Sequence, residues 1–332
     1  MQQYRSDDLR PFVWRVLIVV GIGATVFLVW RIAEALLLIF AGVLIAVLLL
    51  HLRDWVHRWT GLPRGWAFAL VLVVLAALLA AAGLFLGSRV ATEFSALSRQ
   101  IETAIGSLPQ DVTERFGDVG SLFTQFRAVA SNVVFFLSNA IVILFAAIYV
   151  AASPDLYRRG LVLLFPPRQH DRVREVLDVC GYSLWRWMIG TLASMASVGV
   201  LTGLGLWLLD VPAALALGLV AALLEFIPLL GPILAAIPAV LIAFSQGPME
   251  ALWVALLYLV IQQIEGNLIL PMAQKRMVSL PPVVTLGAIV AGGLLFGLLG
   301  IFLATPLAVV LMVIVNLLYI EDTLGEKRQF PG

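Results

Sequence analysis

Charged residues are scarce in this 332-residue chain. Asp, Glu, Lys and Arg together make up only 12% of it, whereas 62% of the residues are hydrophobic and the mean hydropathy is +1.04. A water-soluble fold of this length could not bury so much apolar surface. The composition therefore predicts an all-α polytopic membrane protein that lies in the lipid bilayer. Because the net charge is only +1, no global field attracts nucleic acid, and no nucleic-acid partner is expected.

Cysteine and histidine are also rare. There is one cysteine, Cys180, so an internal disulfide is excluded. The histidines, His51, His57 and His170, show no metal-ligand spacing, and none lies in an apolar segment where it could activate a serine. The chain also lacks a Walker loop, an HExxH pair and the paired carboxylates of an intramembrane protease. We therefore expect no catalytic residues, no metal and no cofactor, and hence no enzyme.

What the chain has instead is a series of long apolar runs, which predict about eight transmembrane helices. Residues 1–87 should hold three spans, segment 132–183 a fourth, and the C-terminal core 184–320 the others. The predicted spans are 11–30, 32–50, 66–87, 131–152, 184–209, 251–270, 282–297 and 303–320. A short amphipathic helix is expected between the fourth and fifth spans, with Cys180 packed on its apolar face. The central apolar segment 213–244 is counted separately, as a broken, re-entrant hairpin.

Basic residues in short loops set the expected orientation. They concentrate in loop 51–65, in the connector of segment 132–183, at Lys275-Arg276 and in the polar tail 321–332. We place all of these in the cytoplasm, together with both termini. Residues 88–131 then fall outside. Their apolar side chains recur at helical spacing, which predicts two amphipathic extracytoplasmic helices that lie on the lipid, pack on the spans or join protomers.

The central segment should break where Glu225-Phe-Ile-Pro228-Leu-Leu-Gly231-Pro232 interrupts the apolar sequence. Proline lacks an N–H and clashes with the preceding turn, so two prolines and a glycine this close should end the helix within the apolar phase. Backbone freed from helical hydrogen bonds survives there only where protein buries it or a watery cavity wets it. The break is therefore the first place to look for function.

Glu225, beside the break, is the sharpest candidate for a transport pathway. An ionisable group at membrane depth is costly and marks a functional site by default. It could exchange a proton with a substrate or bind a cation. The alternative is structural, because the carboxylate could instead accept hydrogen bonds from backbone N–H groups that Pro228 and Gly231 expose.

A second polar group ends the following span. Gln262 and Glu265 share a helical face, and Asn267 comes shortly before the break at Pro271. These side chains either line the pathway or form an interfacial helix end that faces water. The glycine-rich segment beyond them is equally open to two interpretations, a hinge or a close-packing face. Its residues are Gly292, Gly293, Gly297, Gly300 and Pro306.

Two broken apolar segments flanking one polar-ended span are typical of the binding site of a secondary transporter. An ion channel is less well supported, because no repeated filter-like segment is present. A membrane scaffold, whose region 88–131 would recruit a partner, has no need for a carboxylate beside a helix break. The predicted substrate or ion pathway comprises Glu225, Pro228, Gly231, Pro232, Gln262, Glu265 and Asn267.

These segments resemble the signature of the autoinducer-2 exporter family of bacterial permeases. The similar motifs are residues 225–232, the sequence Glu265-Gly-Asn-Leu-Ile-Leu-Pro271, and Leu280-Pro281 followed by Gly292-Gly-Leu-Leu-Phe-Gly297-Leu-Leu-Gly300 up to Pro306-Leu. Their order and spacing agree as well. The similarity is clearest over residues 180–320, whereas the first four spans match in layout only.

The resemblance implies a secondary transporter of the bacterial inner membrane that exports a small polar metabolite, with autoinducer-2 as the first candidate. Members linked to exchange of sodium or lithium for protons make an antiporter the alternative. The resemblance also implies a homo-oligomer, with a pentamer as one expected form, and an elevator-like movement of substrate. By motif, Glu225, Pro228, Gly231 and Pro232 correspond to the family's hairpin, and Gly266, Asn267 and Pro271 to its next motif.

Overall fold

The computed structural model describes residues 9–85, 133–269 and 280–325. Every regular element in these ranges is a helix, which confirms the all-α class. The predicted amphipathic region 88–131, the pair Lys275-Arg276 and the tail from residue 326 lie outside the described residues. In the described ranges three helices are long and apolar enough to cross a membrane, and one bent pair passes the same test together. They are Trp30–Thr60, Pro167–Leu208, Pro282–Glu321, and Ala140–Ala152 with Pro154–Leu163. The predicted count of eight spans is thus not confirmed for this part of the chain.

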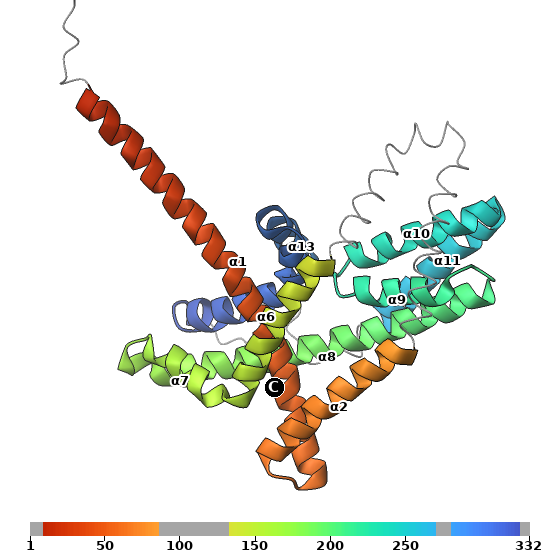
Figure 1. Cartoon of the computed structure of the whole chain (residues 1–332), viewed down its shortest axis with the longest axis horizontal. Helices are drawn as coiled ribbons and strands as arrows, with labels where there is room; N and C mark the ends of the chain where they lie inside the picture. The colour runs from red at the N-terminus through yellow and green to blue at the C-terminus, as the bar shows by residue number, and fades with distance from the viewer. Residues whose placement is uncertain (1–8, 86–132, 270–279, 326–332) are drawn as a thin grey trace, which may run out of the picture.

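The helix α1, Leu9–Thr60, is continuous over 52 residues. The prediction of two separate spans, 11–30 and 32–50, is therefore wrong. No proline interrupts the chain near Arg31, and this side chain pairs with Glu34 at 3.3 Å within the same helix, which favours its continuation. At about 1.5 Å per residue, α1 is roughly 78 Å long. Its N-terminal end projects away from the other helices (Figure 1), whereas the Trp30 indole N–H donates to the Leu295 carbonyl of the glycine-rich segment at 2.8 Å. Because an unbroken helix cannot return to the side where it began, the parity argument for a cytoplasmic N-terminus is lost.

The second half of α1 packs against two apolar helices, α2 (Arg64–Phe85) and α6 (Val133–Ala152). The backbones of α1 and α6 approach closely at Gly42, where an added Cβ would lie 2.5 Å from the Cβ of Ala146. Small residues permit this kind of contact between membrane helices. After α6 the chain bends by 89° into the short amphipathic helix α7 (Pro154–Leu163).

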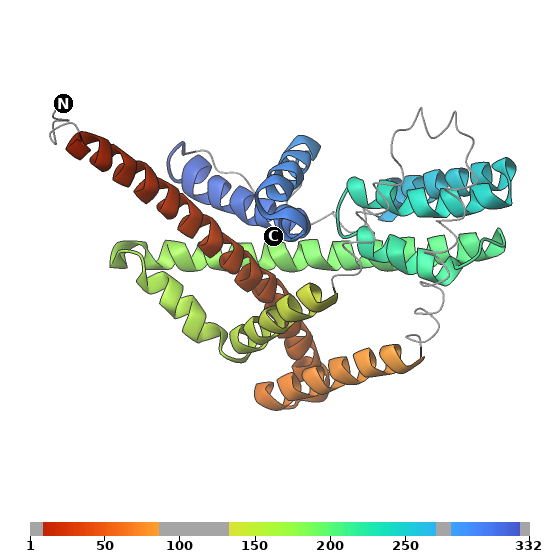
Figure 2. The same ribbon diagram turned by 45° about the horizontal axis from the view of Figure 1, so that its top comes forward.

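Helix α8, His170–Leu208, contains both the predicted amphipathic helix and the predicted fifth span. It follows a single turn of 3-10 helix, η1 (Pro167–Gln169), and no proline separates its polar start from its apolar end. The two elements are therefore one helix. As predicted, Cys180 packs on an apolar face, here against Val313 and Leu317. In Figure 2, α8 runs through the middle of the molecule, with α1 crossing its first half and the central hairpin against its second half.

Hydrogen bonds and ion pairs join the start of α8 to the C-terminal end of the described chain. The Arg172 guanidinium donates hydrogen bonds to both carboxylate oxygens of Asp322, at 2.8 and 3.0 Å, and to the Leu317 carbonyl at 2.8 Å. It also pairs with Glu175 at 2.7 Å. A guanidinium that binds a carboxylate with two parallel bonds fixes geometry as well as charge. Arg172 thus holds the C-terminal end of the described chain against α8.

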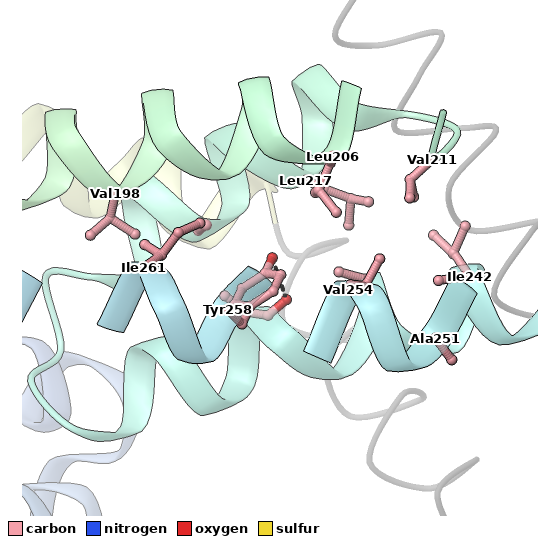
Figure 3. Close-up of a cluster of buried hydrophobic side chains, with 13 residues drawn as sticks. Val198, Leu206, Val211, Leu217, Ile242, Ala251, Val254, Tyr258 and Ile261 are labelled. Carbon is pink, nitrogen blue, oxygen red and sulfur yellow. Dashed lines mark hydrogen bonds between the residues drawn. The ribbon is translucent and has the colours of Figure 1, made fainter. Parts of the chain in front are cut away.

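The central apolar segment forms a helical hairpin, which confirms the predicted break. Its arms are α9 (Ala214–Leu224) and α10 (Leu230–Gln246). Helix α11 (Pro248–Ile264) packs along α10 and continues as the π-helix η2 (Glu265–Ile269). Helices α8, α9, α10 and α11 enclose one apolar core, shown in Figure 3. Its buried members include Val198, Leu206, Val211, Leu217, Ile242, Val254, Tyr258 and Ile261.

The glycine-rich segment is helix α13, Pro282–Ile314, which bends at Gly297 and leads into the π-helix η3 (Val315–Glu321). Gly297 has φ 58° and ψ −140°, a conformation that residues with a side chain rarely adopt. Across the bend the backbones touch, because a Cβ added at Gly292 would lie 2.6 Å from the carbonyl oxygen of Gly300. Gly293 faces Ile301, and Pro306 lies buried in the second half of the helix. The cluster therefore combines a bend with close packing.

Replacing Gly297 with alanine should destabilise the protein through its backbone alone. An added Cβ would meet nothing within 4 Å, so no clash is introduced. A left-handed backbone costs an L-residue about 1–2 kcal/mol, and the thermal midpoint of the purified protein in detergent should fall accordingly. Gly287→Ala is the matched control, because Gly287 has equally open surroundings in the same helix and no positive φ. Equal midpoints for the two variants would show that the bend does not require glycine.

Candidate substrate pathway

The break between α9 and α10 is a tight turn that covers residues 225–229. The Pro228 carbonyl accepts a hydrogen bond from the Leu230 N–H at 2.8 Å, which closes a γ-turn around Leu229. Leu229 has φ 70° and ψ −48°, which is unusual for a residue with a bulky side chain. Gly231 and Pro232 then start α10 directly against the end of α9. Backbone strain of this kind is characteristic of functional sites.

Most backbone donors of the break bond to backbone carbonyls. The N–H groups of Ile227, Leu230 and Gly231 all donate to backbone carbonyls. The Glu225 carboxylate is not their acceptor, so the structural alternative for this residue is not what the structure shows. Glu225 is only 8% exposed, and its Oε2 has no hydrogen-bond partner. Burying an unpaired carboxylate oxygen is costly. This cost favours a role for Glu225 in the reversible binding of a proton, a cation or a polar solute.

Glu225 lies in a cluster with side chains from α8 and α11. The side chains of Gln262 and Glu265 both lie near the Glu225 carboxylate. Glu265 is also only 8% exposed, and its Oε1 accepts a hydrogen bond from the Ser194 Oγ at 2.7 Å. We refer to Glu225, Gln262, Glu265 and Ser194 as the carboxylate cluster. It forms where the hairpin break, α11 and α8 meet.

Two carboxylates in one buried place cannot both remain charged without compensation. A proton, a cation or the hydrogen-bond donors of a polar solute can supply that compensation. The Ser194 hydroxyl already gives one donor to Glu265, whereas the Glu225 Oε2 is left without one. The cluster is therefore chemically suited to exchange protons and to hold a small polar or cationic solute.

The structure brings together three of the predicted pathway residues, Glu225, Gln262 and Glu265. Asn267 lies elsewhere, because its exposed Nδ2 donates to the carbonyl and to the Oε1 of Gln263, at 2.9 and 2.8 Å. The prediction missed Ser194. A single hydroxyl in the apolar part of a long helix gives no sign in the sequence of which side chain it meets.

The tip of the hairpin contacts two other long helices. The Phe226 ring lies 5.5 Å from Trp187 of α8, edge to face, and 5.7 Å from Phe302 of α13, measured between ring centroids. Ile227 packs with Ile289, which comes before the bend of α13. Because interiors are close-packed, neither the hairpin break nor the bend of α13 can move without repacking these side chains. The two broken elements of the sequence thus meet in space.

An apolar groove of about 770 Å³ lies away from this site, between α8 and α9. None of the residues of the carboxylate cluster lines it. The groove follows the seam where glycines let the two helices approach closely, and its open, apolar lining is typical of a surface that faces lipid. Its lining residues include Gly199, Val200, Gly203, Leu204, Trp207 and Gly218.

Comparison with known proteins finds similarity over nearly the whole chain. A family model described as "AI-2E family transporter" matches residues 16–320. The chain is 32% identical over 182 residues to "Putative transport protein YrrI" of Bacillus subtilis, an alignment that covers 55% of this chain and 52% of that protein. It is 27% identical over 322 residues to "Putative transport protein MT0215" of Mycobacterium tuberculosis, covering 88% and 86%. It is 27% identical over 198 residues to "AI-2 transport protein TqsA" of Escherichia coli, covering 58% and 54%. The alignments thus span about half the length of YrrI and TqsA.

Proposed function

Since this chain belongs to the AI-2E family of transporters, we propose that it is a secondary transporter of the bacterial inner membrane that exports a small polar metabolite. The observation that carries the proposal is the carboxylate cluster at the hairpin break. Glu225 and Glu265 are both buried there, and one oxygen of Glu225 has no partner. A structural element alone would gain nothing from such a costly pair, whereas a pathway needs groups that bind and release.

Autoinducer-2 is the first cargo to test. One relative of this chain is named as an AI-2 transport protein, and the cluster offers groups that suit a small hydroxylated solute. Its carboxylates accept hydrogen bonds from hydroxyl groups, and the Gln262 amide can both donate and accept. Export also requires energy, which exchange of a proton at Glu225 would couple to a proton gradient.

Exchange of sodium or lithium for protons is the second candidate. The specific observation in its favour is that the cluster consists of carboxylate, amide and hydroxyl groups, whose oxygens are the ligands that hard cations prefer. In this case the cation itself would be the solute, and no metabolite would move.

One experiment separates these candidates. Proteoliposomes that contain the purified full-length protein are loaded with labelled autoinducer-2, and efflux is followed under an imposed pH gradient. Parallel vesicles without cargo carry a pH-sensitive dye and receive a pulse of sodium. Efflux of label above that of protein-free vesicles supports the exporter. Sodium-driven proton movement without label efflux supports the antiporter, and the absence of both would contradict the proposal.

Assembly and orientation remain predictions. We propose a homo-oligomer, with a pentamer as one form, and a cytoplasmic position for the basic segment that comprises α7 and the start of α8. Charge supports the second point, because this segment carries Arg158, Arg159, Arg168, Arg172 and Arg174. The groove between α8 and α9 would then open toward the lipid or a neighbouring protomer.

A further inference from the structure

Thr202, in the last two turns of α8, is fully buried, and its Oγ1 has no hydrogen-bond partner. Its Oγ1 and the Oε2 of Glu225 are the two side-chain polar atoms in the described ranges that are completely inaccessible to solvent and have no such partner. Buried hydroxyl groups are normally paired with protein or with an internal water. Thr202 could bond to the preceding turn of its own helix, as threonines often do, but it does not. Its position therefore needs an explanation.

The pairing of α8 with α11 shows what Thr202 faces. Ser194 of α8 bonds to Glu265, and eleven residues further along α8 a Cβ added at Gly205 would lie 2.6 Å from the Leu257 Cδ1 of α11. Position numbers thus rise along one helix as they fall along the other, so the helices are antiparallel. Between these two contacts, Val198 faces Ile261 and Leu206 faces Val254 (Figure 3).

This register places Thr202 opposite Tyr258. Thr202 comes four residues after Val198, and Tyr258 three residues before Ile261, so both lie one turn beyond that pair on the same buried faces. The Tyr258 hydroxyl is itself buried and donates to the Ala235 carbonyl of α10 at 3.2 Å. Its oxygen keeps a lone pair that can accept a further hydrogen bond, whereas the Ala235 carbonyl lies inside α10 and also accepts the helical N–H four residues on. The register therefore brings the Thr202 hydroxyl of α8 to the level of the Tyr258 hydroxyl of α11 in an otherwise apolar core.

We propose that the Thr202 and Tyr258 hydroxyl groups hold an internal water between them, and that this water site is the next polar site on the transport path. The role in transport rests on the proposed function, whereas the water site does not. An internal water needs two to four polar partners, and these two hydroxyl groups supply two. The site lies on the side of the carboxylate cluster that leads to the end of α8.

One apolar layer separates the water site from the carboxylate cluster. Ser194 and Thr202 are eight residues apart on α8, which corresponds to about 12 Å. Between them lie Val198 and Ile261, exposed by only 2% and 3%. In this conformation the layer keeps the water site apart from the carboxylates. Passage of a solute or proton requires that it open, as an apolar constriction does when water enters.

Radiolytic labelling tests the water site without any transport assay. Radicals formed from a bound water oxidise the nearest side chain, so a short X-ray pulse should label Tyr258 in the full-length protein in lipid nanodiscs, as mass spectrometry detects. Thr202→Val keeps the shape and removes the hydroxyl, and it should lower labelling of Tyr258 about fivefold, the factor for one hydrogen bond of ~1 kcal/mol. Thr202→Ser should restore it. Thr285→Val, at a buried threonine of α13, is the control and should change nothing.

Flux measurements on the same variants test the role in the path. The probes are labelled autoinducer-2 and a pH-sensitive dye, and Glu225→Gln is measured alongside. We expect Thr202→Val to reduce whichever flux the wild type shows by about the same fivefold factor. Tyr258 labelled no more than background in the wild type would overturn the water site. Labelling lost in Thr202→Val with flux unchanged, while Glu225→Gln abolishes flux, would overturn its role in the path and leave the proposed function intact.

Discussion

Replacing Glu225 with glutamine is expected to lower transport roughly 10- to 100-fold, the range for losing one hydrogen bond to a charged group. Glutamine has nearly the same shape but cannot carry charge or release a proton. It would still fit between the hairpin break and Gln262, so the fold should remain. Because a buried charge is removed, the thermal midpoint should stay the same or rise. The measurement is initial efflux of labelled autoinducer-2 from proteoliposomes, together with a thermal melt of the same preparation.

Glu250→Gln is the matched control for this prediction. Glu250 lies in the first turn of α11, at the end of this helix away from Gln262, and is exposed. The same chemical change there should leave both flux and stability unaltered. Flux of Glu225→Gln that equals that of Glu250→Gln would remove the carboxylate from the pathway. A lower midpoint with normal flux would instead assign Glu225 a structural role.

Glu265→Gln makes the prediction more specific. If the two carboxylates act as one unit, each single substitution should cost about as much as the double substitution. Independent sites would give additive losses instead. Measuring the four proteins of this cycle under one pH gradient therefore tests whether the contact between Glu225 and Glu265 matters for transport.

Much of this site could be predicted from the sequence, because proline and glycine act locally. The break at Pro228 and Gly231 follows from a missing N–H and a missing side chain, and these effects hold in any fold. The cost of a charge in an apolar run is equally local, so Glu225, Gln262 and Glu265 could be chosen before their positions were known. Their convergence could not be predicted, since it depends on how α11 returns along α10.

What the sequence did not show depends on contacts between distant segments. Ser194 and Thr202 are ordinary small residues within an apolar run, and only the pairing of α8 with α11 gives them partners. The continuity of α1 was missed for a different reason. Residues 11–50 are long enough in apolar sequence for two spans, but Arg31 is compatible with a helix and has Glu34 one turn away. A reversal needs a breaker, and none is present there.

Gly231→Ala is expected to disrupt the packing of α9 against α10 and, as a result, the carboxylate cluster. At this position the start of α10 lies against the end of α9, and an added Cβ would overlap the Leu224 carbonyl, with the carbonyl carbon only 2.6 Å away. Both obstacles are backbone, so no rotamer change relieves them. We expect a loss of about 3 kcal/mol or more, at the upper end for overpacking, seen as a large drop in thermal midpoint and in folded yield.

The control for this substitution is Gly181→Ala, because Gly181 lies in α8 with nothing within 4 Å of its Cβ position. Alanine favours a helix over glycine by about 1 kcal/mol, so this variant should be at least as stable as the wild type. Similar midpoints for Gly231→Ala and the wild type would mean that α9 and α10 can separate at little cost. In that case the close turn would be one of several conformations of the hairpin, and Glu225 would move away from Gln262 and Glu265 as the arms part. A large loss for Gly231→Ala alone would instead show that the carboxylate cluster depends on a rigid break.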